Sequence, residues 1–420
     1  MHPRTFWVLD DDDRDVVDDL AVGLGRTAAR VLAYLLRRAE REDEPATAVQ
    51  MQIGTELSRS PISDAVSRLE EDGLIDRSTL PDDTQGRPPS AWRPSGDLAE
   101  SRRRAYEQHA RALLDRTEAL FVDRPSDSEP ETGSETDLTV ALNWRPNGLH
   151  VPIYAASEAA WYDEYGADVD IEHHEGSSRA VDRVRQAEAD VAVAGAATVL
   201  RARAAGVPLV PIAVLYQRAM TVLYTAREAF GEELRSVSQL QGRRIGMVPR
   251  SETGVLGRLF ISQTALEDDI EIVETTGEER AALSTGRADV VTGSMTDPRQ
   301  LERRGKTVDA LQVTDHFPIY GPTIAVHERL LRTRRSALAA FLAGTAGGWA
   351  DAKSDPGPAV DRIAAIGDDE PDDVRATFER AVDDFGDSEA TRERGWGWQR
   401  ERTWDRLRTA LDQGELLTAA

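Results

Sequence analysis

The chain has 420 residues, enough for two or three domains, and it has no cysteine, which excludes disulfides, thiolate chemistry and cysteine-bound zinc. Its 75 Asp and Glu residues outnumber its 51 Lys and Arg residues, and lysine occurs only at Lys306 and Lys353. An acidic surface of this kind favours solubility at high salt, so we expect a halophilic, haloarchaeal source. No 18-residue apolar run and no secretion pattern is present, which favours a cytoplasmic protein without a membrane segment.

A small helical domain is predicted after an acidic stretch, residues 1–19, that we expect to be flexible. The predicted elements are a helix from Gly25, a helix from Thr47 to Leu57, a helix from Pro61 to Asp72, and strands at Leu74–Ile75 and Ala91–Arg93. Thr47 is a good N-cap and Gly73 a good C-cap. Two short strands after a helix pair indicate a wing, so residues 20–96 are assigned to an α+β winged helix-turn-helix.

The second helix of such a motif enters the major groove of DNA with its N-terminal residues near the base edges. The candidate DNA-binding side chains are Arg59, Ser60, Ser63, Ser67 and Arg68 on the helix, and Arg77, Arg87 and Arg93 on the wing. The run from Leu57 to Ile75, with its Leu-Glu-x-x-Gly-Leu-Ile ending, resembles the MarR-like winged-helix regulators of bacteria and archaea. That resemblance implies operator DNA as a partner; a winged helix used only for protein contacts is the alternative.

Residues 97–122 are predicted to form a long helix with an apolar stripe that includes Tyr106 and Leu113. Because operators usually mirror a two-fold axis, the helix is interpreted as the contact of a homodimer. Packing of the helix on its own domain is the alternative. Residues 123–136 are polar and are predicted to be a linker.

Strands alternate with helices from Asp137 onward, which predicts an α/β fold with a mostly parallel sheet. The most informative run is Leu-Asn143-Trp144-Arg-Pro-Asn147-Gly-Leu-His150-Val-Pro-Ile-Tyr154. It begins where a strand ends, which is where open α/β sheets bind ligands. An indole can stack on a flat ring, and amide and imidazole groups can pair with ring nitrogens and an exocyclic amine.

This run is similar to the family that handles the pyrimidine precursor of thiamine, which includes solute-binding proteins and a pyrimidine synthase. Further matching runs are Arg203–Pro208, Leu240–Gly246 and Ser284–Asp289. The resemblance covers about residues 137–365 and implies a type II periplasmic-binding-protein fold. Its first lobe would comprise 137–230 and 320–420, its second lobe 231–319, and the ligand would lie between them.

The chain departs from the synthase pattern. The resemblance would place a cofactor-binding lysine near Ala194, a histidine near Thr198 and cysteines near Phe317–Thr323, and all are absent. Binding without turnover and without a cofactor is therefore predicted. The fold would bring further side chains to the cleft: Tyr154, Thr198, Tyr216, Glu252, Thr253, Asp297 and Tyr320. His173 and His174 are interpreted as surface residues at a strand end.

These patterns together predict a cytoplasmic regulator that binds operator DNA and senses an aminopyrimidine such as hydroxymethylpyrimidine. It would control genes of thiamine biosynthesis or uptake. One alternative keeps the regulator but replaces the effector by a sulfonate, nitrate or an aromatic acid. An alternative of another class, a pyrimidine-precursor synthase, is disfavoured because it needs a Schiff-base lysine.

Overall fold

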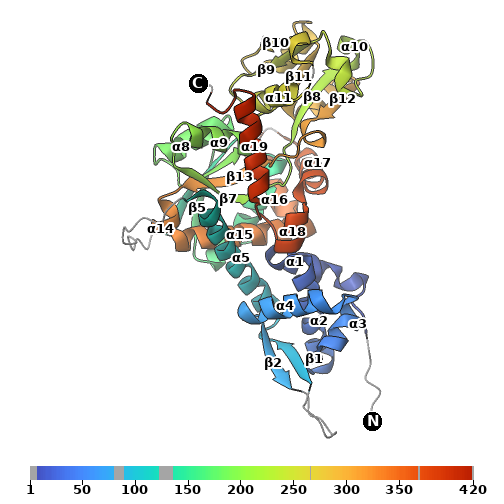
Figure 1. The fold of residues 1–420 in the computed structure, drawn as a ribbon, viewed down its shortest axis with the longest axis vertical. Helices are drawn as coiled ribbons and strands as arrows, with labels where there is room; N and C mark the ends of the chain where they lie inside the picture. The colour runs from blue at the N-terminus through green and yellow to red at the C-terminus, as the bar shows by residue number, and fades with distance from the viewer. Residues whose placement is uncertain (1–6, 80–88, 123–135, 265, 368, 419–420) are drawn as a thin grey trace.

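A computed structural model describes residues 7–79, 89–122, 136–264, 266–367 and 369–418. The chain forms an N-terminal unit and two sheet-containing lobes, which follow one another along the long axis of the molecule (Figure 1). None of the helices in the described ranges is long and apolar enough to cross a lipid bilayer.

The N-terminal unit combines helices with a three-stranded antiparallel sheet of order β1-β3-β2. Its elements are η1 (Asp11–Asp13), α1 (Arg14–Leu24), α2 (Arg26–Glu42), β1 (Ala46–Thr47), α3 (Ala48–Thr55), α4 (Arg59–Glu71), β2 (Ile75–Thr79) and β3 (Ser90–Pro94). Thr47 caps α3 as predicted, in a capping box with Gln50. Helix α4 begins at Arg59, two residues before the predicted Pro61, because Ser58 already has the extended backbone of an N-cap.

The prediction of a flexible acidic N-terminus is wrong for residues 7–19. Asp10 and Asp13 form a capping box, and α1 then buries Val17 and Leu20 in the core of the unit. Asp13 is itself buried and accepts a hydrogen bond from the Arg37 guanidinium at 2.9 Å. The apolar residues of α1 alternate with aspartates. The acidic composition therefore indicated a flexible segment, although the apolar residues recur at the spacing of one helix face.

Helix α5 (Leu98–Phe121) leaves the N-terminal unit and packs against the first lobe (Figure 1). Tyr106, Leu113 and Leu114 are fully buried in the core of that lobe. The stripe assigned to a homodimer is therefore covered within the chain, and the predicted dimer contact through it is wrong. Periodicity reveals an apolar stripe but not which surface covers it. The predicted linker, apart from residue 136, lies outside the described residues.

The first lobe contains a five-stranded sheet of order β5-β4-β6-β13-β7. Its strands are β4 (Asp137–Leu142), β5 (Asp168–His173), β6 (Val191–Gly195), β7 (Leu209–Val214) and β13 (Pro322–His327). Its helices are η2 (Gly148–His150), α6 (Val151–Glu158), α7 (Trp161–Glu164), α8 (Ser177–Arg185), α9 (Ala196–Ala204), α14 (Leu330–Thr333), α15 (Arg335–Ser354), α16 (Gly357–Ile366) and α17 (Pro371–Ala381). Strand β4 runs parallel to both neighbours, whereas β13 runs antiparallel to β6 and β7.

The second lobe contains a five-stranded sheet of order β10-β9-β11-β8-β12. Its elements are β8 (Thr221–Ala226), α10 (Arg227–Phe230), η3 (Val237–Leu240), β9 (Arg244–Met247), α11 (Glu252–Ser262), η4 (Glu267–Asp269), β10 (Glu271–Glu274), α12 (Glu279–Ser284), β11 (Val290–Ser294), α13 (Asp297–Glu302), β12 (Val308–Gln312) and η5 (Val313–Asp315). Strand β8 lies antiparallel between β11 and β12, so both sheets are mixed rather than mostly parallel.

The predicted lobe boundary at residue 230 is too late, because β8 already belongs to the second sheet. The chain crosses between the lobes at residues 215–220 and returns at 316–321. After the return it forms the π-helix η6 (Val382–Gly386), α18 (Glu389–Arg394) and α19 (Glu401–Gln413). Helix α18 lies beside α1, and α19 extends from there toward the second lobe (Figure 1).

Candidate ligand-binding site

The loop after β4 carries the predicted ligand-binding motif and is held by its own polar groups. The Asn147 side chain caps η2, since its Oδ1 accepts the Leu149 N–H at 2.9 Å, and its Nδ2 donates to the Arg145 carbonyl at 2.8 Å. Asn147 is thus committed to the loop itself. The loop leaves Trp144 with 52% of its surface exposed, more than is usual for an indole without a partner.

His150 lies behind Asn143 instead of facing solvent. Its Nε2 is 3.1 Å from the Asn143 Oδ1, and its ring is almost fully buried. Burial lowers the pKa of His150 to about 3, so the imidazole is neutral. Within the described parts of the chain, no group bonds to its buried Nδ1. His150 therefore holds the Asn143 amide oxygen from the interior and does not itself face solvent.

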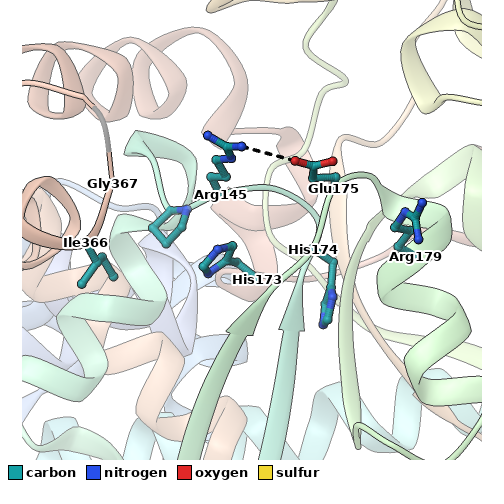
Figure 2. A pocket seen from close by; sticks show the side chains of 8 residues that line it. Arg145, His173, His174, Glu175, Arg179, Ile366 and Gly367 are labelled. Atoms are coloured by element: carbon teal, nitrogen blue, oxygen red, sulfur yellow. Dashed lines mark hydrogen bonds and ion pairs between the residues drawn. The ribbon is translucent and has the colours of Figure 1, made fainter. Parts of the chain in front are cut away.

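A cavity of about 480 Å³ opens beside this loop, at the carboxyl ends of β4 and β5. Its lining residues are Arg145, Pro146, His173, His174, Glu175, Arg179, Ile366 and Gly367 (Figure 2). The Arg145 guanidinium pairs with the Glu175 carboxylate at 3.3 Å. Two arginines and two histidines against one carboxylate make the cavity attractive to an acidic or electron-rich group.

The interpretation of His173 and His174 as plain surface residues missed this cavity. Strand pairing places His173 directly opposite Leu142, the last residue of β4. Residues that follow neighbouring parallel strands meet at one edge of the sheet, and this rule could have placed them beside the Asn143 loop.

Glu252 joins the two lobes. It begins α11 in the second lobe, and its carboxylate reaches the amino end of α9 in the first lobe. One oxygen accepts the Ala197 N–H at 3.0 Å, and the other accepts the Thr198 N–H at 2.8 Å and the Thr198 hydroxyl at 2.7 Å. Burial raises the pKa of Glu252. Glu252 and Thr198, both predicted to touch ligand, thus hold the lobes together here.

The predicted residues Asn143, Trp144, Asn147 and His150 are not among those that line the cavity, and the remaining predicted cleft residues do not line it either. Tyr154 is buried in the core of the first lobe, and the Tyr216 hydroxyl donates to the Leu149 carbonyl at 3.1 Å. Asp297 accepts the Ser294 N–H at 2.7 Å, and the Tyr320 hydroxyl accepts the Arg400 N–H at 2.7 Å. Thr253 pairs with Ser251 at 3.1 Å in the first turn of α11. These side chains have internal partners that strand order alone does not reveal.

Most of the predicted DNA-binding side chains are exposed, but Arg68 is not. Arg59, Ser60, Ser63 and Ser67 are exposed on one side of α4, and Arg77 and Arg93 are exposed on the hairpin. Arg68 points inward, where its Nη1 donates to the Leu24 carbonyl at 2.7 Å. Its prediction as a phosphate contact is therefore wrong. Arg87 lies outside the described residues.

Comparison with solved structures identifies the fold of the two lobes. The chain superimposes on the periplasmic aliphatic sulphonate binding protein SsuA from Escherichia coli with a TM-score of 0.55 and 15% identity, covering 69% of this chain and 95% of SsuA. A Bordetella bronchiseptica RB50 protein gives a TM-score of 0.50 and 20% identity, with coverage of 66% and 89%. The two lobes therefore have the type II periplasmic-binding-protein fold.

The family follows from the sequence. The model of the family described as "NMT1/THI5 like" matches residues 147–359, half of the chain, and the chain belongs to this family. The riboflavin-binding protein RibY of Chloroflexus aurantiacus is 26% identical over 293 residues, 67% of this chain and 82% of RibY.

Two other relatives match shorter stretches. The formylaminopyrimidine-binding protein of Halalkalibacterium halodurans is 24% identical, over 49% of this chain and 62% of that protein. The 4-amino-5-hydroxymethyl-2-methylpyrimidine phosphate synthase THI11 of Saccharomyces cerevisiae is 28% identical over 131 residues, 31% of this chain and 36% of the synthase.

Proposed function

We propose that this protein is a transcription regulator whose two-lobed part binds a small aminopyrimidine related to the thiamine precursor. The observation that carries the proposal is the loop after β4: its Trp144 indole is exposed, Asn143 precedes it, and its next two residues, Arg145 and Pro146, line the cavity. An amide that both donates and accepts, next to an aromatic face, suits a flat nitrogen heterocycle. Relatives named for riboflavin, formylaminopyrimidine and hydroxymethylpyrimidine phosphate support the same class.

The N-terminal unit supports the DNA-binding half of the proposal. Helices α3 and α4 are separated by a short turn, and an antiparallel hairpin follows, which is the element order of a winged helix. The exposed side of α4 offers Arg59 and three serines to a major groove. DNA binding would place the protein in the cytoplasm, and control of thiamine genes is the expected role. A homodimer would need a surface other than the stripe of α5.

A second effector class is favoured by one observation, the arginines of the cavity. Arg145 and Arg179 would suit a sulfonate, nitrate or aromatic carboxylate better than a neutral pyrimidine. An enzyme of the synthase type is disfavoured, because neither Lys306 nor Lys353 lines the cavity.

Thermal unfolding of the full chain in molar KCl tests the effector class. Residues 137–420 alone would expose the core that α5 covers, so the full chain is the proper sample. Hydroxymethylpyrimidine at about 100-fold above its Kd should stabilise the protein by about 2.7 kcal/mol. Trp144→Ala should abolish the shift, whereas the control Trp144→Phe should retain most of it. A shift with sulfonates or aromatic acids but with no pyrimidine would contradict the pyrimidine assignment.

A further inference from the structure

The segment that follows the two lobes, residues 388–400, contacts both crossings between the lobes; we call it the strap. At the first crossing, the Ser388 hydroxyl donates to the Gln217 Oε1 at 2.8 Å, and the Gln217 Nε2 donates to the Trp398 carbonyl at 3.1 Å. At the second crossing, the Arg400 N–H donates to the Tyr320 hydroxyl at 2.7 Å. Gln217 and Tyr320 are both buried.

The other side of the strap contacts the N-terminal unit. The backbone N–H of Trp396 donates to the Val22 carbonyl at 2.8 Å, near the end of α1. The His109 Nε2 of α5 donates to the Trp396 carbonyl at 2.6 Å. The Glu393 carbonyl packs against Gly25, where a Cβ would lie 2.3 Å away and where φ is 73°. Gly25 is thus required both by its backbone and by the closeness of the strap.

One further step joins the strap to α4. Gly25 forms the corner between α1 and α2, and the neighbouring Leu24 carbonyl accepts the Arg68 hydrogen bond from α4. A cavity of about 60 Å³ lies between the strap and α1, lined in part by Val22, Thr391 and Trp396. The contact between the strap and α1 is therefore close, with a small pocket beside it.

We infer that the strap is the element that transmits lobe movement to the N-terminal unit, through the corner at Gly25 to α4. The crossings change conformation when two lobes rotate relative to each other, and the strap is bonded to both of them. This inference depends on the proposed function only for its biological purpose. A coupling element must have contacts at both ends that differ between two states, so breaking one end should uncouple the other.

The test opens the lobes without effector or DNA. Glu252→Arg removes the acceptor and places a cation at the amino end of α9, and Glu252→Gln is a milder version that keeps the side-chain size. Hydrogen–deuterium exchange of the full chain is then followed in α9 and α11, which report opening, and in residues 20–30 and α4, which report transmission. We expect exchange in both regions to change at least fivefold.

The uncoupling variants are Gln217→Ala and Tyr320→Phe. Tyr320→Phe keeps the aromatic ring, whose centroid lies 5.2 Å from that of the Trp404 ring. Combined with a Glu252 variant, each should retain the change in α9 and α11 but reduce the change in α4 to less than twofold. Tyr162→Phe is the matched control. It also removes a buried hydrogen bond, the one of 3.1 Å between the Tyr162 and Thr345 hydroxyls, but at a site outside the strap. It should leave transmission intact.

An undiminished α4 response in both uncoupling variants would overturn the inference. So would opened lobes without any change in residues 20–30, and so would lobes that stay closed in both Glu252 variants. If transmission is found but no effector or DNA is ever bound, the strap stands and the proposed function fails.

Discussion

Two arginines of helix α4 have opposite surroundings. Arg59 is exposed at the amino end of the helix, whereas Arg68 donates to the Leu24 carbonyl and lies 3.6 Å from the Asp72 carboxylate. Burial lowers the pKa of Arg68, although the guanidinium remains charged at every ordinary pH. The first arginine can meet a phosphate; the second holds the unit together.

Arg59→Ala should weaken binding to DNA selected from a random pool and reduce the salt slope of that binding by about 1, with stability unchanged. Arg68→Ala should instead cost about 1–3 kcal/mol of unfolding free energy, because the Leu24 carbonyl loses its charged donor. Fluorescence anisotropy across a KCl series and urea unfolding measure the two effects. Equal losses of DNA affinity at unchanged stability would show that Arg68 contacts DNA after all.

Residue-scale predictions from the sequence succeeded where the chemistry is local. Thr47 could be identified as a cap because its partner, Gln50, lies three residues away. Tyr216 and Tyr320 could not be excluded from the cleft, because Leu149 and Arg400, their hydrogen-bond partners, lie far away in the sequence. The sequence revealed the loop around Trp144 but not that His150 would be buried behind it.

Helix α5 links the N-terminal unit to the first lobe by its packing and by ion pairs. Arg102 lies 3.0 Å from Asp19 of α1 and 3.0 Å from Asp351 of α15, and its guanidinium covers the Trp161 ring at 4.7 Å. The helix is therefore part of the body of the molecule, with one face in the core of the lobe.

Leu113→Ala should reduce the unfolding free energy by about 2–5 kcal/mol and leave the oligomeric state unchanged, since its side chain is fully buried within the chain. Arg111→Ala, at an exposed site of the same helix, is the control and should have little effect. Urea unfolding and sedimentation velocity give the two readouts. A dissociated dimer at unchanged stability would restore α5 as a dimer contact.

Element-scale prediction was accurate for segments with a clear period and weak elsewhere. The alternation of strands and helices from Asp137 onward and the long helix α5 were found because their apolar residues recur at the expected spacing. Strands β8 and β12 were missed; they pair with each other across more than eighty residues, and only the sheet shows them as strands. Helix α1 was missed because acidic composition was taken for flexibility.

At the scale of the whole molecule, the formal net charge of −24 bears on every measurement. Phosphate contacts weaken as salt rises, whereas an acidic surface of this density repels itself most strongly at low salt. DNA binding should therefore be measured across a range of KCl concentrations. The N-terminal unit, which carries the proposed DNA-binding surface, lies at the end of the molecule opposite the second lobe, and the first lobe lies between them (Figure 1).

The most direct test of the account is the affinity of the full chain for its selected DNA, measured with and without saturating hydroxymethylpyrimidine. We expect the effector to change the Kd for DNA by about 5- to 150-fold, the range of ordinary allosteric coupling, and Trp144→Ala to abolish the change. A DNA affinity that is the same with and without bound effector would contradict the central claim that this protein is a ligand-responsive regulator.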